Sequence, residues 1–76
     1  MNLENKKFVM DNGQEYLTIE SVEYGGKCYA FIINKANPLD SLYVEVFFDG
    51  HLKVQTIDPD LFKEKIYPLF LDKFGK

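Results

Sequence analysis

Gly25-Gly26 limits the possible folds more than any other feature of the sequence, because it interrupts an apolar stretch over residues 22–33. Paired glycines adopt the positive φ angles that a two-residue hairpin turn requires. We therefore predict two antiparallel strands joined at this point, with Tyr24 opposite Lys27. Apolar side chains then occur on both faces of the hairpin, whereas a strand with one solvated face alternates apolar and polar residues. Something must cover the second face.

The register of this hairpin divides its side chains between two faces. The same pairing puts Val22 opposite Tyr29 and Ile19 opposite Ile32. One face is small and aliphatic, and it carries Leu17, Ile19, Ser21, Cys28, Ala30 and Ile32. The other face is aromatic and mixed, and it carries Thr18, Glu20, Val22, Tyr29, Phe31 and Ile33.

Two more segments carry turn or loop signals before the middle of the chain. Asp-Asn-Gly at residues 11–13 tolerates positive φ, and it predicts a hairpin between a short strand in residues 6–10 and a longer strand that begins near Glu15. Residues 35–41 are predicted to form a loop, because Pro38 lacks the amide that a sheet ladder needs.

A third hairpin is predicted after the strand at residues 42–48. A three-residue loop at 49–51 sets Val46 opposite Val54, whereas a two-residue loop would put a lysine opposite Val46. We choose the three-residue loop because it keeps the apolar side chains on one face. It also puts His51 in the turn.

Asp58-Pro59 marks the start of a helix, since Asp58 can accept hydrogen bonds from the first amides and Pro59 suits the first helical position. Pro68 falls inside the helical pattern, where it removes a backbone hydrogen bond at a cost of about 3 kcal/mol. We therefore expect a kink or a restart near Tyr67, and an end at Gly75. The helix has one apolar stripe, formed by Phe62, Ile66, Phe70 and Phe74 with Leu69 beside them.

Together these elements predict a single α+β domain over residues 1–76: a four- to five-stranded antiparallel meander with one C-terminal helix packed on one face. We assign the small aliphatic face to the helix, because Ser21, Cys28 and Ala30 permit close approach. The reverse assignment stays open.

Size and composition restrict the class of protein. A chain of 76 residues buries only about 60% of its unfolded surface, and its one cysteine cannot form an internal disulfide. The net charge of −3 and the absence of arginine argue against a nucleic-acid binder. The start of the sequence lacks the apolar segment of an export signal, and no long apolar run follows, so we expect a soluble, cytoplasmic protein.

The aromatic face is the predicted functional surface, because 16% of the residues are aromatic and so small a domain cannot bury them all. We expect it to bind a protein partner, either another protein or a second copy in a homodimer. Two alternatives stay open. In the first, the sheet curls so that both faces contribute to a single core, or the amino-terminal strand and the long loop fold over the rings. In the second, single-stranded nucleic acid stacks on the rings. The predicted partner-binding residues are Glu20, Tyr29, Phe31, Ile33, Tyr43, Glu45 and Phe47.

Catalytic and metal-binding patterns are not found in the sequence. Cys28 lies within a hairpin and the single histidine, His51, lies in a distant turn, so a nucleophile and base pair is not indicated. Asp58 and Asp60 are explained by helix capping, and two carboxylates alone are a weak metal signal. We predict that the protein is not an enzyme and that it needs no cofactor or metal.

The segment DNGQEYLTIESVEYGGKCY, residues 11–29, resembles small uncharacterised proteins of low-GC Gram-positive bacteria and of their phages and mobile elements. The resemblance covers about the first half of the chain. It implies a setting in which small proteins bind and modulate a host protein.

Overall fold

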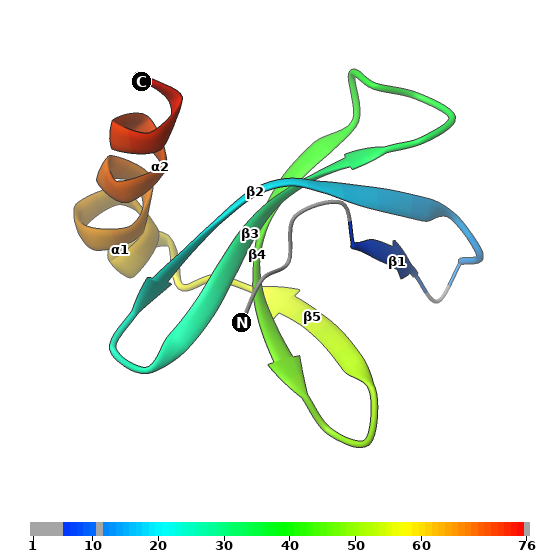
Figure 1. Ribbon diagram of the computed structural model, residues 1–76, viewed down its shortest axis with the longest axis horizontal. Helices are drawn as coiled ribbons and strands as arrows, with labels where there is room; N and C mark the ends of the chain where they lie inside the picture. The colour runs from blue at the N-terminus through cyan, green and yellow to red at the C-terminus, as the bar shows by residue number, and fades with distance from the viewer. Residues whose placement is uncertain (1–5, 11, 76) are drawn as a thin grey trace.

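The structure is a computed structural model, and it describes residues 6–10 and 12–75. Five strands form one antiparallel sheet in the order β1-β2-β3-β4-β5. Their bounds are β1 Lys7–Val9, β2 Glu15–Tyr24, β3 Lys27–Asn34, β4 Ser41–Phe48 and β5 Leu52–Thr56. The meander curls into a half-barrel, and a C-terminal helix packs against it (Figure 1). The predicted α+β class is confirmed, with five strands.

The predicted turns are confirmed where the residues are described. Gly25 and Gly26 have φ angles of 59° and 79°, and Tyr24 pairs with Lys27. The three-residue loop at 49–51 sets Val46 opposite Val54 as predicted. The first hairpin also forms, with Gly13 at φ 83°, although Asp11 lies outside the described residues. Turn chemistry thus decides these connections locally.

A β-bulge changes the faces of the strand β2. The register of β2 and β3 shifts between Thr18 and Glu20, so Thr18, and not Ile19, lies opposite Ile32. The predicted Ile19–Ile32 pair is therefore wrong. Because side chains alternate along a strand, this extra residue exchanges the faces of Leu17 and Thr18 relative to the uninterrupted register.

The helix covers the aromatic face, so its predicted packing on the small aliphatic face is wrong. Val22 and Tyr29 of the sheet pack with Ile57, Ile66 and Phe70, and we call these five buried residues the helix cluster. The rings supply far more apolar area for the helix to bury than Ser21, Cys28 and Ala30 would. The apolar area that the helix buries therefore matters more for its position than how closely the helix can approach the sheet.

The second face is covered by the curl of the sheet itself. We call the buried residues on this side the barrel cluster: Phe8, Tyr16, Ala30, Ile32, Val44 and Val46. Met10, Cys28, Leu52 and Val54 pack against it and stay partly exposed. The sheet curls, as one alternative expected, but its two faces form two separate clusters, and the helix rather than the curl covers the aromatic rings.

The helix has three consecutive parts: α1 (Pro59–Leu61), a π-helical turn η1 (Phe62–Ile66) and α2 (Tyr67–Phe74). Asp58 caps the start by accepting from the Leu61 amide at 3.0 Å. The predicted restart at Tyr67 is confirmed: the π turn precedes it, and Pro68 falls in the first turn of α2, where its missing amide is tolerated. None of the helical segments in residues 6–10 and 12–75 is long and apolar enough to cross a membrane.

Phe70→Ala is expected to reduce the free energy of unfolding by about 3–5 kcal/mol, because the fully buried ring leaves a cavity in the helix cluster. A 76-residue domain has only about 4–11 kcal/mol in total. Urea unfolding followed by circular dichroism measures the change. The neighbouring Leu71 is half exposed, and Leu71→Ala is the matched control. Equal losses in the two variants would contradict this packing.

Thr18→Val is expected to stabilise the fold by about 1 kcal/mol. Among the described residues, the hydroxyl Oγ1 of Thr18 is buried without a hydrogen-bond partner, and valine has nearly the same shape without this polar atom. The same urea titration measures the gain, with the exposed Thr56→Val as control. A less stable Thr18→Val variant would show that the hydroxyl is satisfied in solution.

Candidate functional site

The predicted partner-binding residues do not form one open surface. Tyr29 is 1% exposed beneath the helix, and Phe31 and Tyr43 are partly buried beside it. Ile33 and Phe47 are also partly buried. The expectation that this face is uncovered is therefore wrong, because the helix takes up most of its rings.

Ring contacts hold the helix on this face. The ring of Tyr43 lies 4.7 Å from that of Phe31, 4.9 Å from that of Phe62 and 5.0 Å from that of Phe70, between centroids. Burial raises the pKa of the Tyr29 and Tyr43 hydroxyls above the ordinary 10.0. Rings packed in this way do not offer a platform on which bases could stack.

The two predicted carboxylates join elements of the fold. Glu20 accepts from Lys73 of α2 at 3.3 Å, and Lys73 also donates to the Ser21 carbonyl at 2.7 Å. The pKa of Glu20 is lowered, first by the Ser21 amide and then by Lys73. Glu45 accepts from Gln55 of the neighbouring strand at 2.9 Å. Both side chains are therefore engaged within the chain.

A second group of apolar side chains on α2 remains partly exposed, and we call it the helix stripe. It consists of Tyr67, Leu71 and Phe74, with exposed fractions between 38% and 50%. Two of its rings also contact rings of the sheet. Between ring centroids, Phe74 lies 5.8 Å from Phe31 and Tyr67 lies 5.9 Å from Tyr43. Phe74 and Tyr67 thus adjoin Phe31 and Tyr43, two residues of the predicted aromatic face that stay partly exposed.

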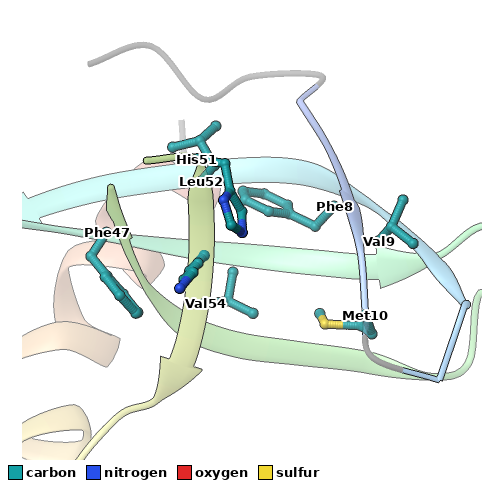
Figure 2. A pocket seen from close by; sticks show the side chains of 8 residues that line it. Phe8, Val9, Met10, Phe47, His51, Leu52 and Val54 are labelled. Atoms are coloured by element: carbon teal, nitrogen blue, oxygen red, sulfur yellow. The ribbon is translucent and has the colours of Figure 1, made fainter. Parts of the chain in front are cut away.

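A groove of about 340 Å³ lies between the two edge strands of the half-barrel, at the small end of the range for binding pockets. Phe8 and Met10 line it from β1 and the residue after it, and Leu52 and Val54 line it from β5. Figure 2 shows Phe8, Met10 and Val54 projecting into the space between these strands. All four side chains belong to the barrel cluster or pack against it. The floor of the groove is thus the open side of a core.

The ionisable side chains among the described residues that line this groove are basic: His51 and Lys53. Lys53 lies 3.3 Å from Asp49 in an exposed ion pair within the turn. Such an exposed pair contributes only about 0–1 kcal/mol. The groove combines an apolar floor with one lysine and one histidine on its rim.

The groove exists because the curled sheet does not close. β1 and β5 are the ends of the strand order, and each pairs with one neighbour among the described strands. Of the predicted set, only Phe47 lines the groove, and in Figure 2 it lies across β5 from Phe8. The sequence signal that was missed is the apolar pair Leu52 and Val54 on β5, the last strand among the described residues.

A second hollow, of about 370 Å³, lies between β2 and α2, where Lys73 already pairs with Glu20 and Ser21.

Cys28 is partly buried, and its sulfur lies 3.9 Å from a Glu23 oxygen. Within the described part of the chain, no group of three His, Cys, Asp or Glu side chains is placed to hold a metal ion.

A polar cluster anchors the loop between β3 and β4. The buried Asn34 donates to Gln14 at 2.6 Å and to Asp40 at 3.2 Å, and Tyr16 donates to Asp40 at 2.5 Å. The hydrogen bond from Tyr16, followed by that from Asn34, lowers the pKa of Asp40 below its ordinary 3.8. This network explains a nearby third hollow, which Asn34 and Gln14 line, as part of a structural loop.

Comparisons of this chain with protein-family models, with curated proteins and with solved structures find no match.

Asp40→Asn is expected to reduce the free energy of unfolding at pH 7, because the ionised carboxylate accepts from Tyr16 and Asn34. The folded-state pKa of Asp40 is depressed, so its contribution is present above the unfolded-state value near 3.8 and is lost as the pH falls through the folded-state pKa. The difference in the free energy of unfolding between wild type and variant should therefore narrow in urea titrations below pH 4. Asp49→Asn, which also removes one exposed carboxylate, is the control. A gap that stays constant down to pH 2 would contradict the assignment.

Proposed function

We propose that this chain is a non-enzymatic protein-interaction module that binds a partner protein at the groove between β1 and β5. The observation that carries the proposal is the apolar floor of Phe8, Met10, Leu52 and Val54 along the unclosed side of the half-barrel. Apolar surface that borders a hollow and is rimmed by polar side chains is typical of protein-binding sites.

The setting of this function comes from the resemblance of residues 11–29 to small proteins of low-GC Gram-positive bacteria, their phages and mobile elements. We accordingly place the protein among small phage or mobile-element proteins that act by binding and modulating a host protein. The engaged carboxylates Glu20 and Glu45 and the covered ring of Tyr29 support the groove over the aromatic face as the binding surface.

Val54→Lys is expected to reduce capture of the partner from a lysate of the source cells about tenfold, because a bound partner would bury an unpaired charge in the groove. Mass spectrometry of the proteins retained by the immobilised chain measures the loss. His51→Glu changes an exposed turn residue on the same groove and should act in the same direction without disturbing the core.

Leu39→Ser is the matched control, since Leu39 is 93% exposed in the loop before β4 and lies outside the groove. The partner is the protein that wild type and Leu39→Ser retain and that both groove variants lose. A protein retained by both groove variants but lost with Phe74→Ser would place the interaction on the helix stripe and contradict the proposal.

A further inference from the structure

We infer that the occupant of the groove is one extended segment of the partner, with alternating apolar and acidic residues, which adds as a new strand to the free edge of β5. This inference rests on the proposed function and specifies the chemistry of its partner. Three properties of the groove argue for it: the unpaired backbone of its walls, the alternation of its side chains and its charge.

The backbone argument concerns the edge of β5. Among the described strands, β5 pairs with β4 alone, through five residues from Leu52 to Thr56. Alternate residues of an edge strand turn their amide and carbonyl groups outward, where an added strand can bond to them. β1 has only three residues, so β5 is the longer template. An extended peptide satisfies these groups, whereas a helix or a small molecule does not satisfy the row.

The alternation argument concerns the two faces of β5. Leu52 and Val54 face the barrel cluster, and Lys53 between them points to the opposite face because side chains alternate along a strand. A strand added beside β5 has the same alternation. Its inward residues meet the apolar floor with Phe8 and Met10, and its outward residues meet Lys53. The matching segment therefore alternates apolar and acidic side chains.

The charge argument selects acidic over basic residues. Lys53 and His51 are the ionisable groups on the described lining, and the exposed Asp49 is the only counter-charge within 4.0 Å of Lys53 among the described residues. A carboxylate on the added strand takes over this contact. A second copy of the chain that paired its own β5 with this edge would bring a second lysine and no carboxylate, since the strand reads LKVQT.

The experiment titrates the full ¹⁵N-labelled chain with a capped peptide of four valines alternating with four glutamates, followed by amide chemical shifts. We expect shifts confined to β5, the 49–51 turn and β1, with α2 unchanged. A peptide with lysines in place of the glutamates should bind at least about fivefold more weakly, and so should the glutamate peptide to Lys53→Glu. Lys63→Glu, an exposed helix position, is the matched control and should bind like wild type.

Backbone methylation tests the strand geometry directly. Two further peptides are N-methylated on all valines or on all glutamates, so that each loses the amides of one edge while the side chains stay the same. Addition to β5 predicts that one of these peptides loses binding and that the other retains it. Loss in both or in neither overturns the inference, as does equal binding of the glutamate and lysine peptides.

The remaining outcomes separate this inference from the proposed function. Sedimentation of the chain alone that reveals a dimer, which Val54→Lys dissociates, would identify a second copy as the occupant and overturn the acidic segment. Partner capture that depends on Val54 and His51 while no peptide shifts the β5 amides would retain the groove as a protein-binding site and overturn the added strand. Peptide binding to β5 without groove-dependent capture would retain the added strand and overturn the groove as the site where the partner protein is captured.

Discussion

The packing of the helix on β2 and β3 is the contact on which the rest of the structure depends. Ile66 and Phe70 are fully buried and pack in one cluster with Val22 and Tyr29 of the sheet. Asp58 caps the first turn. The π turn at Phe62–Ile66 precedes Pro68, which falls in the first turn of α2, and Ile66 and Phe70 on either side of it both stay buried on the sheet. Once the helix occupies this face, the other face has to find a different cover.

The described residues hold no second helix for that face, so the sheet covers it by curling. The bulge beside Ile19 supplies part of the curvature, since a bulge bends its strand and increases the local twist. A five-stranded meander of these lengths curls without closing, and its first and last strands become the walls of a groove. The candidate site is thus a consequence of how a 76-residue chain covers two apolar faces with one helix.

Much of the fold could be predicted from short stretches of sequence. The turns at Gly25-Gly26 and at 49–51, their registers and the start of the helix at Asp58 follow from residues a few positions apart. The candidate site could not be predicted in the same way. Phe8 and Val54 are 46 positions apart (54 − 8 = 46), and they line one groove only because three strands between them curl. Of the predicted binding residues, Phe47 alone reached that groove, from the hairpin that was correctly placed.

Local chemistry therefore decided where the chain turns, because glycine and asparagine permit positive φ angles and proline fixes φ whatever surrounds them. Tertiary packing decided which face the helix covers, since that choice compares the apolar area of two whole faces, and Ser21, Cys28 and Ala30 could not compete with the rings. It also decided the bulge, which exchanges the faces of Leu17 and Thr18 without any proline or glycine to mark it. Tertiary packing also decided the groove, because an unpaired edge is a property of the assembled sheet and of no single segment.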